Sequence, residues 1–158
     1  MVLIPTKRQV MKNLFYAIIL VFGIAGTISA KEGGKVVQSK QNFETTYENI
    51  EKFLKEKNIA IFAEFKHSDW AKDVGEPLNP TKVIVFGNPK VGTALMRENQ
   101  KIAIELPLKI AIWQDKSGKV FVSATDIRGI AKKYGIKNQK VIDNIAKLLE
   151  QILQNATK

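Results

Sequence analysis

The sequence predicts a single small α+β domain after an N-terminal signal peptide, with a mostly antiparallel sheet and helices packed on one face. Its 158 residues give room for one ordinary domain. Apolar residues make up 45% and charged residues 25%, which is a globular composition. Short apolar strands alternate with helices that are apolar on one side only. Such helices fit one face of a sheet.

The first thirty residues have the parts of a secretory signal peptide. Three basic residues precede an unbroken apolar run at 14–25, and small residues follow as far as Ala30. A membrane span needs roughly 20 apolar residues, so we expect cleavage near Ala30 rather than an uncleaved anchor. Met11 also begins a complete signal, so translation starts at Met1 or Met11. Cleavage leaves no stable membrane span and makes the protein periplasmic or extracellular.

A flexible tail is expected at 31–34, followed by the single domain at 35–158. Asn42 is a favoured helix N-cap residue, and a buried central strand is typical of an apolar run such as 83–86. The first half of the domain predicts, in order, a strand at 35–39, a helix from Asn42 to about Lys57, a strand at 59–65, a short helix at 67–74 and a strand at 83–86.

The second half begins where Gly87–Gly92 interrupts the pattern. Asp115–Gly118 is typical of a hairpin turn between two strands. The sheet face that the helices leave open carries apolar Ala111 and Trp113, so we expect a ligand cavity or a subunit interface there. The predicted elements are a helix at 94–98 capped by Thr93, one at 100–106 capped by Asn99, strands at 107–114 and 119–124, a helix from Asp126 to Tyr134, and a last helix with an apolar stripe at 141–153.

Composition excludes several kinds of site. Cysteine is absent, which removes disulfides, thiolate metal sites and cysteine nucleophiles. The one histidine, His67, excludes any site that needs two imidazoles from one chain. Without the three basic residues of the signal, the sequence has 22 Lys and Arg and 15 Asp and Glu, which gives a net charge of +7. Lysines mixed with glutamates are typical of a solvated face with general affinity for anionic surfaces, and no nucleic-acid partner is expected.

A specific pattern occupies residues 81–126. It reads TKVIVFGNPKVGTALM, then IELPLKIAIWQD, then GKVFVSATD. The pattern resembles the domain-of-unknown-function 302 family, over about residues 35–155. The resemblance implies a compact α+β fold, commonly a homodimer, and no settled reaction. The family's apolar-Asp-His step is matched by His67, with Lys66 in place of the usual Asp. Of its Tyr-Asn-Asp-like step only Asp126 remains.

His67 and Met96 are the candidate metal ligands. His67 directly follows a strand, where it can act as an acid or base, a haem ligand or a copper ligand. The alternative is a histidine that only fixes the local backbone. Met96 is its natural soft partner, because histidine and methionine suit haem iron and copper. The alternative for Met96 is a residue that fills the core.

The turn between the strand at 83–86 and the next helix is a second candidate. Backbone amides at a helix start at Thr93 can hold a small anion, whereas a tight turn is the alternative. Asp126 is expected to cap a helix or to supply a polar group. The candidate ligand-binding residues are therefore His67, Met96, Gly87, Asn88, Pro89, Thr93 and Asp126.

Three hypotheses follow. The first is an exported homodimeric module that binds a small ligand or a redox cofactor, haem ahead of copper, around His67, Met96 and the 87–93 turn. The second is an enzyme that uses His67 as an acid or base. It needs a polar partner such as Asp126 or Thr93 within hydrogen-bond reach of the imidazole. The third is a structural partner for another cell-envelope protein, with an apolar open sheet face and no pocket.

We predict that the protein isolated from its native cells begins at Lys31. The small residue Ala30 follows the apolar run, which is where signal peptidase cuts. N-terminal sequencing and intact mass spectrometry identify the first residue. A mature protein that retains 14–25 would contradict this prediction and favour a membrane anchor.

Overall fold

The computed structural model of the protein describes residues 34–158, so the predicted signal peptide and most of the predicted tail lie outside the described residues. None of the helices in this part of the chain has the length and apolar composition needed to cross a bilayer. The elements are β1 (Val36–Gln38), α2 (Phe43–Glu56), β2 (Ala60–Phe65), α3 (His67–Asp73), β3 (Thr81–Gly87), α4 (Pro89–Glu98), the 3-10 helix η1 (Gln100–Glu105), β4 (Leu108–Gln114), β5 (Val120–Ala124), α5 (Ile127–Tyr134) and α6 (Gln139–Ala156).

The strands form one five-stranded sheet in the order β1-β5-β4-β3-β2, and every neighbouring pair is antiparallel. The predicted antiparallel sheet is thus confirmed. Ile84 lies opposite Ile110, and Ile112 lies opposite Val122. Because alternate residues of a strand point to opposite faces, these four side chains share one face of the sheet.

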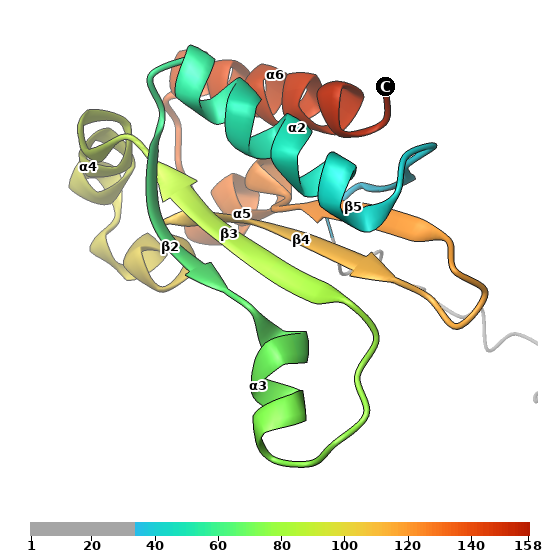
Figure 1. Cartoon of the computed structure of the whole chain (residues 1–158). Coiled ribbons are helices and arrows are strands. Elements are labelled where there is room, and N and C mark those ends of the chain that lie inside the picture. The colour runs from blue at the N-terminus through green and yellow to red at the C-terminus, as the bar shows by residue number, and fades with distance from the viewer. Residues whose placement is uncertain (1–33) are drawn as a thin grey trace, which may run out of the picture. The chain divides into compact units, whose positions relative to one another are not determined.

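Helices α2 and α6 pack against each other and cover that face (Figure 1). Each contributes an apolar stripe that meets the sheet, as amphipathic helices do. The predicted covering of one face by helices is therefore confirmed. The largest fully buried apolar side chains of this core are Phe86, Ile50, Leu54, Ile84, Leu95, Ile102, Ile110, Ile112, Ile127, Ile152 and Val122.

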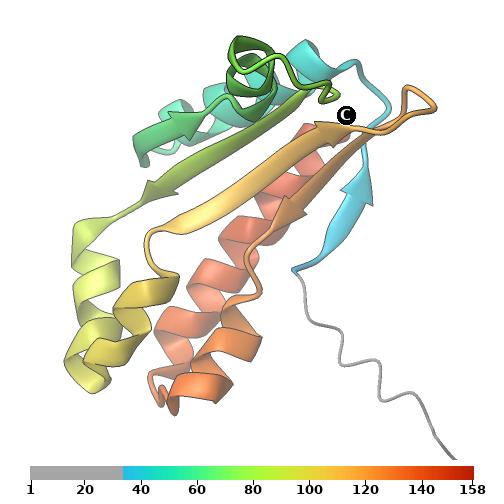
Figure 2. The same cartoon turned by 90° about the horizontal axis from the view of Figure 1, so that it is seen from below.

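The opposite face of the sheet has no helix over its middle strands, as Figure 2 shows. Val83, Ala111, Trp113 and Phe121 lie on it and are only half-buried. The rings of Trp113 and Phe121 stack with centroids 5.7 Å apart. The remaining helices lie elsewhere: α4, η1 and α5 gather at one end of the sheet, away from α3 (Figure 2).

Every helix of the described residues except α3 begins at a side-chain cap, and three of these five caps lie at predicted residues. Asn42, Asn99 and Asp126 each accept a hydrogen bond from a backbone amide in the first turn of the following helix. The prediction for Thr93 is wrong. Helix α4 begins at Pro89 with Asn88 as its N-cap, so Thr93 lies inside the helix. Proline favours this early start because its fixed φ suits the first helical position.

We predict that Leu54→Ala lowers the free energy of unfolding by about 3 kcal/mol, because Leu54 is fully buried and the truncation leaves a cavity. Urea denaturation measures the loss. Glu48→Ala is the matched control, since Glu48 is exposed on the same helix, and it should change stability by less than about 0.5 kcal/mol. Equal effects of the two variants would contradict this core.

Candidate ligand-binding site

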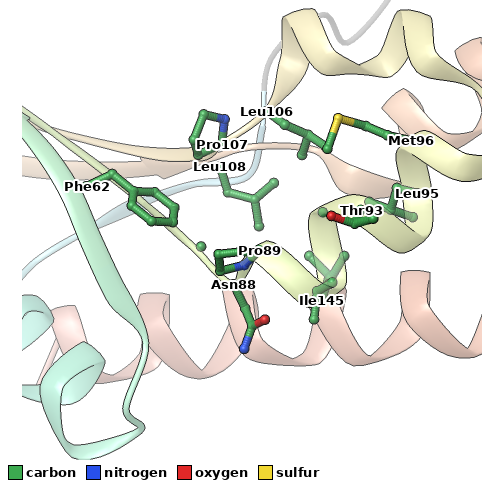
Figure 3. Close-up of a pocket in the computed structure, with 13 residues that line it drawn as sticks. Phe62, Asn88, Pro89, Thr93, Leu95, Met96, Leu106, Pro107, Leu108 and Ile145 are labelled. Atoms are coloured by element: carbon green, nitrogen blue, oxygen red, sulfur yellow. The ribbon is translucent and has the colours of Figure 1, made fainter.

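An open cavity of about 320 Å³ lies where β3 leads into α4 (Figure 3). Phe62 lies at one end of it and Met96 at the other. Apart from Asn88 and Thr93, its walls are apolar. The lining residues are Phe62, Gly87, Asn88, Pro89, Val91, Gly92, Thr93, Leu95, Met96, Leu106, Pro107, Leu108 and Ile145.

A glycine and a strand irregularity shape the cavity. The register of β2 against β3 shifts between Ile61 and Ala63, which leaves Phe62 as the extra residue of a bulge. A side chain on Gly87 would place its Cβ 3.3 Å from Phe62 Cε2, closer than an ordinary contact. Gly87 therefore allows the Phe62 ring to pack against the end of β3. Sequence periodicity gives no signal for such a bulge.

A second hollow of about 170 Å³ shares five lining residues with the first. It continues from the turn at Asn88 to α6, where Val141 and Leu148 line it. Ile145 belongs to both hollows. The last helix therefore supplies part of the site as well as part of the core.

The first amides of α4 are already bonded within the turn. Lys90 N donates to Asn88 Oδ1 at 2.9 Å, and the amides of Val91 and Gly92 both donate to the Asn88 carbonyl at 3.0 Å. Pro89 has no N–H to offer. The expected anion site at a Thr93 helix start is therefore wrong, and these amides form a capped tight turn.

His67 lies outside this cavity. It is the first residue of α3, it is exposed, and its ring lies 5.4 Å from that of Trp70 and 6.2 Å from that of Phe65. In the described part of the chain the imidazole makes no hydrogen bond. Asp126 is also elsewhere: its Oδ1 accepts from Gly129 N at 3.1 Å as the cap of α5.

The structure therefore brings Gly87, Asn88, Pro89, Thr93 and Met96 to one cavity but adds neither His67 nor Asp126. A haem or copper site formed by His67 together with Met96 does not fit this arrangement. Within residues 34–158, no three His, Asp or Glu side chains are grouped as metal ligands would be. The hypothesis of acid–base catalysis has no assembled partner for the imidazole among these residues.

A separate polar cluster joins α2 to β2 and β3. Tyr47 donates a hydrogen bond to Glu64 Oε1 at 2.8 Å, and Lys82 Nζ lies 4.2 Å from the Tyr47 ring centroid and 3.1 Å from Glu44 Oε2. Burial, followed by the hydrogen bond to Glu64, raises the pKa of Tyr47 well above its usual value. The phenol therefore stays neutral and serves as a donor that ties the helix to the sheet.

Several lining residues were missed by the sequence analysis. Leu106 and Pro107 belong to the quoted motif, but their place at the cavity depends on how η1 turns toward α4. Ile145 is predictable as part of an apolar stripe, although not as a site residue. Phe62 depends on the bulge. Each of these positions is set by packing between elements, which a linear pattern does not record.

Comparison with known families and structures agrees with this fold. The family described as "Domain of unknown function DUF302" matches residues 35–152. A solved structure, the uncharacterized conserved protein DUF302 from Bacillus stearothermophilus, superimposes with a TM-score of 0.70 at 17% identity. The match covers 79% of this chain and 98% of that chain. The shared fold therefore spans nearly the whole length of that crystallised protein.

Two curated proteins with similar sequences are named as fluoride-specific ion channels. The "Fluoride-specific ion channel FluC 1" of Brucella suis biovar 1 (strain 1330) is 33% identical over 100 residues, which are 63% of this chain and 39% of that protein. The "Fluoride-specific ion channel FluC 2" of Brucella melitensis biotype 1 is also 33% identical over 100 residues, 37% of its length. The matched segment is therefore well under half of each channel protein.

Proposed function

The chain belongs to the DUF302 family of domains of unknown function, and on this premise we propose that it is an exported module that binds a small, largely apolar ligand in the cavity beside α4. The observation that carries the proposal is the composition of the cavity walls. They are apolar except for the Asn88 amide and the Thr93 hydroxyl. Apolar walls with a few polar groups are typical of small-molecule sites.

The lining also indicates the ligand class. No charged side chain lines the cavity, so a neutral molecule avoids the cost of losing water from an ion without gaining a partner. The Phe62 ring and the Met96 thioether offer polarisable surfaces for an aromatic or aliphatic ligand. Haem and copper remain outside this proposal, because the cavity lacks the second donor that His67 was expected to supply.

The proposed module is a homodimer that associates through the open face of its sheet. Val83, Ala111, Trp113 and Phe121 are half-buried apolar residues on that face. A second copy laid against them would remove their surface from water, which favours association. The export part of the proposal rests on the signal-like first thirty residues.

A second candidate function is that of an accessory domain for a membrane protein of the cell envelope. The similarity to segments of proteins named as fluoride-specific ion channels favours it. In this case the open sheet face would be occupied by another chain rather than by a second copy. The oligomeric state of the isolated protein distinguishes the two candidates.

We predict saturable binding of N-phenyl-1-naphthylamine, a neutral apolar dye, to residues 31–158. Gly92→Phe should weaken the binding at least about tenfold, because its ring would fill space that the ligand needs. Gly92→Ala is the matched control. Its Cβ would lie 3.9 Å from Leu106 Cδ1, an ordinary contact, so the cavity stays open. Fluorescence titration gives the dissociation constants.

Dye binding that persists in Gly92→Phe would contradict the cavity as the binding site. We expect His67→Ala to bind the dye as the wild type does. Loss of binding in this variant would instead show that the imidazole contributes to the binding site. Thermal unfolding of each variant shows that a lost signal reflects a filled cavity and not an unfolded chain.

We predict that Ala111→Lys converts the dimer into a monomer, because an ammonium group would be buried in the sheet-to-sheet interface without a partner. Sedimentation velocity measures the change. Lys147→Ala, at an exposed position of α6, should leave the dimer intact. A wild-type protein that sediments as a monomer at all concentrations would contradict the homodimer and favour the accessory-domain function.

A further inference from the structure

Helices α4, η1 and α5 lie together at one end of the domain (Figure 2), and this end carries several exposed basic side chains. We propose that this end docks on the surface of a bilayer that contains anionic phospholipids. The proposal goes beyond ligand binding and does not depend on the cavity. We call this surface the basic end; its cations are Arg97, Lys101, Lys109, Lys132, Lys133 and Lys137.

Specific contacts bring these residues to one place although the sequence separates them. Glu98 Oε2 accepts a hydrogen bond from Lys137 N at 2.6 Å. Asn99 Nδ2 donates to the Tyr134 carbonyl at 2.8 Å. Lys133 Nζ lies 2.9 Å from Glu105 Oε1. The end of α4, η1 and the end of α5 therefore form one connected surface.

The six cations of the basic end exceed the two carboxylates that contact it, those of Glu98 and Glu105. Glu105 pairs with Lys133, whereas Arg97, Lys101, Lys132 and Lys137 are exposed and make no ion pair within residues 34–158.

The same asymmetry extends along the chain. Between 97 and 140 there are ten Lys and Arg against four Asp and Glu. Between 41 and 80 there are five Lys and Arg against eight Asp and Glu. The cations of the basic end, rather than the sequence windows alone, favour one orientation of the domain in the field of an anionic surface.

Helix η1 also carries an exposed apolar side chain at the basic end, between Lys101 and Lys109 in the sequence. Ile104 in η1 is 77% exposed, the highest value among the large apolar side chains of the described residues. Lys109 Nζ donates to the carbonyl of Glu105 at 3.3 Å and to that of Pro107 at 3.0 Å, so an ammonium group lies beside the backbone that follows Ile104. An exposed apolar residue next to lysines is the arrangement by which peripheral proteins bind the lipid interface.

The chemistry of the basic end favours lipid headgroups over nucleic acid. Five of its six cations are lysines, which act as point charges and do not read bases through planar bidentate contacts. The aromatic residue nearest to them, Tyr134, is half-buried and donates its hydroxyl hydrogen bond to Glu105 at 2.9 Å. It therefore offers no free ring for stacking on a base. Each lysine near an anionic bilayer contributes a similar increment of attraction.

Flotation of residues 31–158 with lipid vesicles tests the proposal. We expect binding to phosphatidylcholine vesicles that contain phosphatidylglycerol, and no binding to phosphatidylcholine alone. Lys101→Gln combined with Lys137→Gln should weaken binding about 30-fold, since two lysine contributions are lost. Ile104→Ser should weaken it about tenfold, because less apolar surface enters the interface. High salt should reduce binding of the wild type.

The matched control is Lys116→Gln combined with Lys147→Gln, which removes the same charge from the hairpin turn and from α6. It should weaken binding by less than about threefold, because these lysines lie off the basic end. An equal loss in the control would overturn the proposal in favour of a simple net-charge effect. Absence of vesicle binding, or tighter binding to duplex DNA than to vesicles, would also overturn it. Gly92→Phe should float as the wild type does, which separates this test from that of the ligand cavity.

Discussion

The sheet is covered on one face only, and most other features of the molecule follow from this constraint. Helices α2 and α6 are long enough to span the sheet, and both pack on the face that holds Ile84 and Ile110. The four remaining helical segments are short and lie beyond the ends of the strands. The other face therefore keeps its apolar residues half-exposed, and the strand ends become the places where cavities form.

The segment from Gly87 to Pro107 shows how a few local choices turn a strand end into a site. Gly87 allows Phe62 to approach, and the Asn88–Pro89 cap begins α4 at once, without an intervening loop. Helix η1 then returns the chain to the sheet through Leu106 and Pro107, which complete the cavity wall. The same short helix holds the exposed Ile104 of the basic end. One connection between β3 and β4 thus contributes to both the cavity and the basic end.

How much could be predicted from the sequence depended on whether a feature is local. Asn42, Asn99 and Asp126 were identifiable as caps because a cap involves residues within one turn. Thr93 failed as a cap because Asn88 and Pro89 begin the helix one turn earlier, and a linear pattern does not rank two competing caps. His67 and Met96 do not share a site, contrary to the first hypothesis, for a different reason. A shared site depended on where α3 and α4 lie relative to the sheet, which is decided by packing among distant elements.

The buried polar side chains of the domain hold the fold together. Ser39 donates to the Ala156 carbonyl and accepts from Thr46, both at 2.8 Å, so the last helix is tied to the chain before α2. The hydrogen bond from the Tyr47 hydroxyl to Glu64 likewise ties α2 to β2. No buried side-chain nitrogen or oxygen of the described residues lacks a hydrogen-bond partner.

The proposed functions use three surfaces of the domain, namely the apolar cavity, the open sheet face and the basic end. Each of them would recognise its proposed partner by shape, apolar contact or charge. Apolar burial and Coulomb attraction are weakly directional. Such surfaces are suited to holding a molecule or a membrane in place. The binding module that we propose uses surfaces of this kind.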